Sequence, residues 1–258
     1  MSEKLRAQGL RVAYGRREVL RGADFALAQG EMAALLGLNA SGKTTLLRAV
    51  CGLVPLKGGD CRIDGSRYLQ SDERHRAKLI SYLPQRPSGL HNLSVMDVVL
   101  MGFNPHISFF ASPGKRERAA SLEALDRLGM KGSAGEDFSL LSEGQKQLVL
   151  LARALVQDTG LLLLDEPDSA LDYPNRHLVL GLLRNLLKQG GRSALITLHD
   201  PNFALAYCDR LLMLRDGVIA GDLAVSACGA EELRSCLSLV YGAVEVIESQ
   251  GRFVMLRA

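Results

Sequence analysis

The sequence predicts an α/β fold that is interrupted by an all-helical insertion. Short apolar runs typical of buried strands alternate with helical patterns at both ends of the chain, whereas residues 94–157 carry three helical patterns and no convincing strand. A glycine-rich loop also joins one of these strands directly to a helix. The 258 residues suit one domain, with a core at about 1–85 and 159–258 and the insertion at about 86–158.

The N-terminal part is expected to form an antiparallel β subdomain and the first core strand. Two strand-like segments flank the polar turn Gly15-Arg16-Arg17, and an apolar run ends at Gly37, after which a loop leads into a helix. A charged stretch at 71–78 separates the last two strands of this part. The expected strands are 10–14, 19–27, 32–36, 60–63 and 79–83, and the expected helix is 44–50.

In the second half of the chain, the helical insertion comes first and the α/β alternation then returns. Asp216-Gly217 is a tight-turn signal, which predicts a hairpin between the strands on either side. The insertion is expected to hold helices 94–101, 115–128 and 143–157. The later elements are expected to be strand 161–164, helix 175–188, strand 193–197, helix 201–207, strands 211–214 and 218–222, a helix from Ala230, and strands 243–247 and 253–256.

Composition places the chain among ordinary globular proteins. Hydrophobic residues make up 47% and charged residues 23%, so the chain should fold and not remain disordered. A net charge of +3, spread along the chain, is too small for a nucleic-acid surface. No apolar run approaches the ~20 residues of a spanning helix, and the start of the chain lacks an apolar signal core. We therefore expect a cytosolic protein without nucleic-acid partners.

The cysteines and histidines do not predict a metal centre. The five cysteines form no C-x-x-C pair, which argues against a zinc site, a redox pair and a disulfide framework. Cys51 and Cys208 lie in apolar surroundings and are expected to be buried. The five histidines show no metal-ligand spacing either.

The glycine-rich loop at 37–44 fits the pattern G-x-x-x-x-G-K-[ST], between a buried strand and a helix. Such a loop points its backbone N–H groups at phosphate oxygens, and the positive end of the following helix adds to that field. Lys43 would reach the β- and γ-phosphates, and the Thr44 hydroxyl would ligate Mg²⁺. The alternative is a chance glycine-rich turn. The expected nucleotide-binding residues here are Gly37, Asn39, Ala40, Ser41, Gly42, Lys43, Thr44 and Thr45.

A second acidic motif follows the apolar run at 161–164. Asp165 and Glu166 come at the end of this expected strand, which is the edge where α/β sheets bind ligands. Asp165 would hold the magnesium shell, and Glu166 would orient or deprotonate the attacking water. Without the glycine-rich loop, two solvated acids would be the ordinary interpretation.

Residues 141–145 open the last helix of the insertion. Ser142 with Gln145 forms a capping-box pattern, which by itself requires no function. The same capped helix start, with Gly144, also presents a hydroxyl and N–H groups to an anion. Both interpretations need the same geometry.

Together these motifs, with Ser169-Ala170-Leu171-Asp172 and His199, resemble the nucleotide-binding subunit of ABC transporters from end to end. The resemblance implies the ABC ATPase fold, whose core contains the glycine-rich phosphate-binding loop (the P-loop). It also implies ATP and Mg²⁺ as cofactors. It implies that Gln85 reaches Mg²⁺ and water, that Tyr14 stacks on adenine, and that His199 contacts the γ-phosphate and holds the water with Glu166. The implied magnesium ligands are Thr44, Gln85 and Asp165, and further nucleotide contacts come from Ser142, Gly144, Gln145 and Asp172.

The resemblance also implies partners. The chain would form a head-to-tail homodimer, with each ATP between one P-loop and the other chain's residues 142–145. It would dock as a peripheral subunit on the cytoplasmic face of the inner membrane, against a transmembrane permease pair, and an importer would also use an extracytoplasmic binding protein. Segments at 98–106, 199–202, 208–210 and 240–242 resemble the importers of iron chelates, haem and cobalamin. The expected substrate is a metal chelate, or a related metal complex or oxyanion.

Three positions depart from the family pattern: Glu143 replaces a glycine, Leu148 an arginine and Asp168 a threonine. None removes a phosphate contact, a magnesium ligand or the base. The segment 103–111, with Phe109 and Phe110, is predicted either to pack inside the insertion or to line the groove for a cytoplasmic helix of the permease.

Two other functions remain open. One is a soluble ABC ATPase in metal-cluster assembly, and the other is a nucleotide-binding regulatory module. The presence of both Glu166 and His199 argues against the regulatory module, because a module without turnover needs neither.

Overall fold

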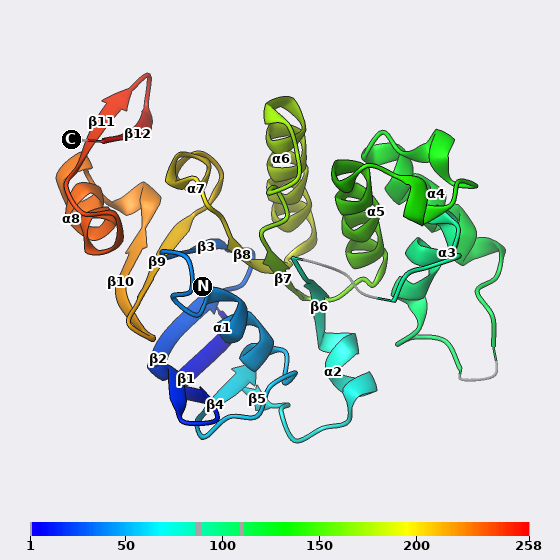
Figure 1. Ribbon diagram of the computed structural model, residues 1–258, viewed down its shortest axis with the longest axis horizontal. Helices are drawn as coiled ribbons and strands as arrows, with labels where there is room; N and C mark the ends of the chain where they lie inside the picture. Colours follow the sequence, from blue (N-terminus) through cyan, green and yellow to red (C-terminus); the bar gives the residue numbers. More distant parts are fainter. Residues whose placement is uncertain (1, 86–88, 109–110, 258) are drawn as a thin grey trace.

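The computed structural model describes residues 2–85, 89–108 and 111–257, so Phe109 and Phe110 lie outside the described residues. Its centre is a six-stranded sheet in the order β10-β9-β3-β8-β7-β6 (Figure 1). Neighbouring strands are parallel except β9 and β10, which form the predicted hairpin. The strands are β3 (Met32–Leu36), β6 (Ile80–Leu83), β7 (Leu161–Asp165), β8 (Ser193–Thr197), β9 (Arg210–Arg215) and β10 (Val218–Ala224).

The N-terminal sheet is antiparallel, as predicted, in the order β2-β1-β4-β5. Its strands are β1 (Glu3–Tyr14), β2 (Arg17–Ala28), β4 (Gly58–Ile63) and β5 (Ser66–Arg67). β1 begins well before the predicted residue 10. Register shifts along its pairing with β2 interrupt the alternation of apolar and polar residues, so the period-2 pattern hides the first half of the strand.

β3 shows why the sheet is buried on both faces. Ala33 and Leu35 pack into a core shared with the N-terminal sheet and helix α1 (Lys43–Val50). Met32, Ala34 and Leu36 pack into the second core, under the other helices. A strand covered on both faces carries a continuous apolar run, and this run is the signal that the sequence contains.

The helices between β6 and β7 gather at one end of the molecule (Figure 1). They are α3 (Val95–Leu100), α4 (Lys115–Arg127) and α5 (Glu143–Val156), with short 3₁₀ turns at Met101–Phe103, Lys131–Ser133 and Phe138–Leu140. The other helices are α2 (Glu73–Leu79), α6 (Tyr173–Gly190), α7 (Pro201–Tyr207) and α8 (Ala230–Tyr241), with a 3₁₀ turn at Val225–Ala227. No helix in the described part of the chain is long and apolar enough to span a bilayer.

Helix α2 falls in the stretch 71–78, where the sequence predicts only a charged connection. None of its side chains is buried, so the helix has no apolar stripe to detect. Asp72 begins the helix by accepting a hydrogen bond from the His75 N–H at 2.7 Å. In the sequence, this N-cap aspartate was the only signal for the start of helix α2.

The C-terminal hairpin, β11 (Val244–Ser249) and β12 (Arg252–Arg257), is fixed to helix α7. The Asn202 side chain accepts from the Met255 N–H at 2.7 Å and donates to the Met255 carbonyl oxygen at 3.2 Å. Because Asn202 lies three residues after His199, the tail braces the helix that begins beside the predicted site.

The cysteines give a labelling prediction. Cys51, Cys61, Cys208 and Cys236 are buried, and burial raises the pKa of Cys61 to about 12 and that of Cys236 to about 11. Since the thiolate is the reactive form, these thiols should resist Ellman's reagent at neutral pH. We expect one thiol per folded chain, the partly exposed Cys228, to react first, and Cys228→Ser to remove that phase. Rapid labelling of several thiols before unfolding would contradict the burial pattern.

Candidate functional site

The glycine-rich loop lies between β3 and α1, as predicted, at the end of a central strand of the sheet. Its shape depends on two small residues. A Cβ at Gly37 would lie 2.6 Å from Ser41 Oγ and 2.7 Å from the Leu214 carbonyl oxygen, so no side chain fits there. Gly42 has a φ of 106°, which favours glycine because it lacks a Cβ. The loop therefore packs closely against the protein on one side and curves around an open space on the other.

That space is a hollow of about 520 Å³. It brings together most of the residues that the sequence predicts as nucleotide or catalytic contacts. The predicted residues that line it are Asn39, Ala40, Ser41, Gly42, Lys43, Thr44, Thr45, Gln85, Glu166 and His199. Arg17 and Val19 also line it, and sequence reasoning missed both. The available signal for Arg17 was a cation directly after the turn at Gly15.

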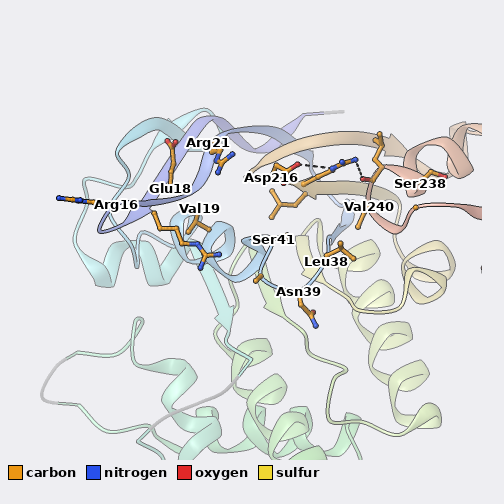
Figure 2. A pocket seen from close by; sticks show the side chains of 17 residues that line it. Arg16, Glu18, Val19, Arg21, Leu38, Asn39, Ser41, Asp216, Ser238 and Val240 are labelled. Carbon is orange, nitrogen blue, oxygen red and sulfur yellow. Dashed lines mark hydrogen bonds and ion pairs between the residues drawn. The ribbon is translucent and has the colours of Figure 1, made fainter.

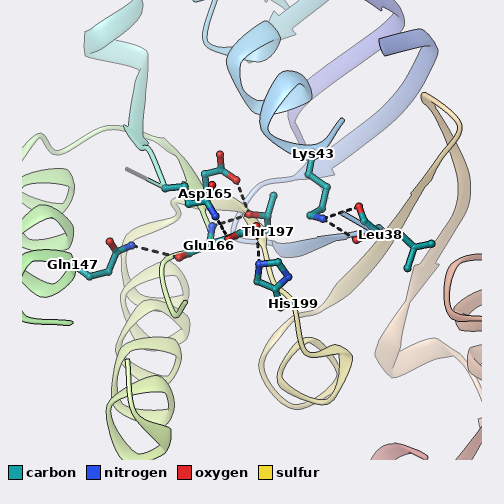
Figure 3. Close-up of polar contacts among 9 residues, drawn as sticks. Leu38, Lys43, Gln147, Asp165, Glu166, Thr197 and His199 are labelled. Atoms are coloured by element: carbon teal, nitrogen blue, oxygen red, sulfur yellow. Dashed lines mark hydrogen bonds and ion pairs between the residues drawn. The ribbon is translucent and has the colours of Figure 1, made fainter. Parts of the chain in front are cut away.

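Lys43 is buried at the base of the loop. Its ammonium group donates to the carbonyl oxygens of Gly37 at 2.8 Å and Leu38 at 3.2 Å (Figure 3). Burial lowers the pKa of Lys43, and the nearby carboxylates of Glu166 and Asp165 oppose this shift. The charge is therefore held among carbonyl oxygens inside the hollow, where a phosphate would be a stronger acceptor.

Asp165 ends strand β7 and is fully buried. Its Oδ1 accepts a hydrogen bond from the Thr197 hydroxyl at 2.9 Å, while Oδ2 has no partner among the described residues. Burial raises the pKa of Asp165, and the nearby hydroxyl groups of Thr44 and Thr197 oppose this shift. An unpartnered carboxylate oxygen beside the Thr44 hydroxyl is the hard oxygen set that Mg²⁺ prefers, so these side chains fit the expected ion.

Glu166 contacts two other predicted residues. Its Oε1 lies 2.8 Å from His199 Nε2 (Figure 3). Its Oε2 accepts a hydrogen bond from the Gln85 side chain. Gln85 follows β6, Glu166 follows β7 and His199 follows β8, so three parallel strands deliver these side chains to one edge of the sheet. Asp200 then caps helix α7.

The residues at 142–145 form the predicted capping box at the start of α5. Ser142 Oγ accepts from the Gln145 N–H at 3.3 Å, and Gln145 Oε1 accepts from the Ser142 N–H at 3.0 Å. Within the described chain, Ser142, Gly144 and Gln145 do not line the hollow at the glycine-rich loop. One copy of the chain therefore keeps the two predicted halves of the nucleotide site apart.

Four further predicted residues, Gly37, Asp165, Tyr14 and Asp172, are also absent from the lining of this hollow. Tyr14 ends β1, and its side chain is 50% exposed. Asp172 is the N-cap of α6 and accepts from the Asn175 N–H at 3.0 Å.

Sequence reasoning assigned no role at the site to three buried residues near Glu166. Gln147 of α5 donates to the Glu166 carbonyl oxygen at 3.5 Å, and Thr197 accepts from the Glu166 N–H at 2.7 Å. Asp168 is 2% exposed, has an Oδ1 without a partner among the described residues, and has its pKa raised by burial. A polar residue inside an otherwise apolar helix or strand was the available signal for Gln147 and Thr197.

A second hollow, of about 810 Å³, adjoins the glycine-rich loop (Figure 2). It shares five lining residues with the first hollow and reaches the end of α8; the shared residues are Arg17, Val19, Asn39, Ala40 and Ser41. Its charged lining residues are Arg16, Arg17, Glu18, Arg21, Arg215 and Asp216. The excess of arginine makes this flank of the loop attractive to anions.

Comparison with known proteins identifies the family. Residues 20–169 match the sequence profile of ABC transporters. The zinc transport system ATP-binding protein TroB of Treponema pallidum is 40% identical over 220 residues, which cover 84% of this chain and 80% of TroB. The hemin import ATP-binding protein HmuV of Streptomyces coelicolor is 41% identical over 214 residues, which cover 83% of this chain and 75% of HmuV.

Solved structures agree with the sequence comparison. A transporter described as being of metal-chelate type, in an inward-facing conformation, matches with a TM-score of 0.79 and 30% identity, covering 98% of this chain and 96% of that chain. The dimeric ABC transporter cassette MJ0796 matches with a TM-score of 0.79 and 25% identity, covering 86% of this chain and 98% of that chain. The predicted fold is confirmed, and the chain belongs to the ABC transporter family as an ATP-binding subunit that hydrolyses ATP.

Proposed function

We propose that this chain energises an importer of a metal chelate or a related metal complex. The observation that carries the proposal is its full-length similarity to a metal-chelate type transporter, since 98% of this chain aligns at 30% identity. The relatives named for zinc transport and hemin import support the same substrate class.

The site residues suggest how ATP is bound and hydrolysed. The N–H groups of residues 39–45 and the Lys43 ammonium would hold the phosphates, and Tyr14 would receive the adenine. Thr44, Gln85 and Asp165 would hold Mg²⁺, which when bound neutralises charge on the phosphates. Glu166 would orient the attacking water, and His199 would hold Glu166 and that water in line.

We also propose that a second copy completes the site. Ser142, Gly144 and Gln145 do not line the hollow of their own chain, and the start of α5 presents an exposed hydroxyl and free N–H groups. In a head-to-tail dimer these groups would face the partner chain's ATP, and Asp172 would lie near the same interface. The dimeric state of the similar cassette MJ0796 supports this arrangement.

Glu143 should weaken this dimer only slightly. Its side chain is 79% exposed, and its Oε1 lies 2.9 Å from Lys146 Nζ, so solvent and the lysine both reduce its repulsion of a phosphate. We expect Glu143→Gly to tighten ATP-driven dimerisation by at most about fivefold and to leave the maximal rate nearly unchanged. Sedimentation velocity over an ATP titration measures the first effect.

Lys146→Met is the matched control for Glu143. It removes the neutralising cation and should shift dimerisation in the opposite direction, toward weaker association. A Glu143→Gly variant without turnover would show a direct catalytic or structural role for Glu143 and would overturn this interpretation.

The remaining partners follow from the same proposal. A transmembrane permease pair would supply the path, and an extracytoplasmic protein would deliver the substrate, with this chain at the cytoplasmic face of the inner membrane. Residues 86–158 would act as a helical subdomain, with the segment 103–111 beside the permease. Phe103 itself packs against the core, so only part of that segment is free for docking.

Reconstitution tests the proposed function. The chain should co-purify with a polytopic membrane protein, and proteoliposomes of that complex should take up radiolabelled zinc, hemin or an iron siderophore only with ATP. Purification without any membrane partner, together with ATPase activity, would favour the soluble metal-cluster ATPase. Uptake of an oxyanion alone would move the substrate outside the metal chelates.

A further inference from the structure

Thr197 connects the two acidic residues of the site. It is the last residue of β8, is fully buried, and pairs in parallel register with Asp165 on β7. This register places the two side chains at the same edge of the sheet. The Thr197 hydroxyl donates to Asp165 Oδ1 at 2.9 Å and accepts from the Glu166 N–H at 2.7 Å (Figure 3). A single oxygen therefore contacts both neighbouring acids.

The Glu166 backbone needs such support. Its φ is 52°, in the left-handed region that residues with a Cβ seldom adopt, and such conformations persist only where surrounding contacts hold them. Its carbonyl oxygen accepts from the Ser169 N–H at 3.2 Å and from Gln147 Nε2 at 3.5 Å. Thr197 holds the other side of the residue, at the N–H. These contacts fix the direction in which the Glu166 side chain leaves the strand.

The same hydroxyl also orients the Asp165 carboxylate. Because Thr197 occupies Oδ1, Oδ2 is the carboxylate oxygen that is left without a partner among the described residues. The Thr197 hydroxyl donates its one proton to Asp165 and accepts the Glu166 N–H with a lone pair. Because it donates one hydrogen bond and accepts the other, the rotation of the hydroxyl group is fixed.

We propose that Thr197 is a positioning residue, which aims Asp165 Oδ2 at the divalent cation and fixes Glu166 for hydrolysis. The cation is part of the proposed function, on which this inference rests. Groups that hydrogen-bond a metal-ligating carboxylate typically contribute 10-fold to 100-fold to metal affinity or activity. Thr197 acts on ligand and base at once, so its removal should lower both cation affinity and turnover.

Thr197→Val tests this role. Valine keeps the branched shape and the strand preference but lacks the hydroxyl, and water cannot replace it at a fully buried position. With the full-length chain and a non-hydrolysable ATP analogue, we expect Mn²⁺ binding measured by EPR to weaken by about 10-fold or more. The kcat for ATP should fall by about 10-fold to 100-fold, and the KM for the magnesium–ATP complex should rise as the cation affinity falls, because the nucleotide binds together with the ion.

Two control variants separate positioning from structural support. Thr197→Ser restores the hydroxyl and should recover Mn²⁺ affinity and kcat to within about threefold of wild type. Thr159→Val removes a hydroxyl that is 2% exposed and donates to the Leu161 carbonyl oxygen at 3.0 Å, at the opposite end of β7. It should lower the melting temperature about as much as Thr197→Val and leave Mn²⁺ binding unchanged.

The outcomes are distinct. Normal Mn²⁺ affinity and kcat in Thr197→Val, or equal defects in Thr197→Ser, would overturn the inference. Failure of the wild-type chain to bind Mn²⁺ with nucleotide would overturn the proposed cation site instead. Weak Mn²⁺ binding confined to Thr197→Val, in a chain that melts like Thr159→Val, would support the positioning role.

Discussion

Glu166→Gln is expected to reduce the rate of ATP hydrolysis by at least about 100-fold and to leave ATP binding intact. Glutamine keeps the size of the side chain and one hydrogen-bond acceptor, but it lacks the carboxylate that would take a proton from water. It also loses the charge that pairs with His199 at 2.8 Å. Since hydrolysis would reopen the dimer, we expect the variant to accumulate as an ATP-bound dimer, visible by size-exclusion chromatography.

Glu31→Gln is the matched control for this variant. Glu31 is also a largely buried glutamate, with a side chain 12% exposed and 3.5 Å from Arg210, but it precedes β3 at the end opposite the glycine-rich loop. Its substitution should leave hydrolysis within about twofold of wild type. Near-normal ATP turnover in Glu166→Gln would contradict the assignment of Glu166 as the base.

Lys43→Met is expected to weaken ATP binding by about 100-fold. Methionine keeps the apolar stem but removes the ammonium group, which lies at the base of the hollow against the Gly37 and Leu38 carbonyl oxygens. A charge in this buried place interacts more strongly with phosphate than it would in water, because less solvent screens it. Titration with a fluorescent ATP analogue measures the change in dissociation constant.

Lys4→Met provides the comparison for Lys43. Lys4 is also buried, at 9% exposed, and pairs with Asp64 at 2.8 Å, but it belongs to the N-terminal sheet. This variant should lose some thermal stability and bind ATP as the wild type does. If Lys43→Met also bound ATP normally, the glycine-rich loop would not be the phosphate site.

The elements that sequence reasoning found share a buried apolar face. The strand at Met32–Leu36 and the helix at Glu143–Val156 were predicted almost to the residue because burial demands an apolar run or an apolar stripe. Helix α2 was missed because it buries nothing, and β1 was cut short because its register shifts disturb the alternation. Local sequence patterns reflect contact with a hydrophobic core, so an element without regular contact to the core cannot be recognised from its sequence pattern.

The sequence alone determined which residues belong to the glycine-rich loop, the acidic strand end and the capped helix start. Each of these motifs is contiguous, and its chemistry follows from residue types at short spacing. The family resemblance implied that Gln85, Glu166 and His199 share one site, and the tertiary structure shows what brings them into contact: parallel pairing aligns the ends of strands that lie far apart in the chain. The same register places Thr197 against Asp165 and Glu166, a contact that no spacing along the chain could predict.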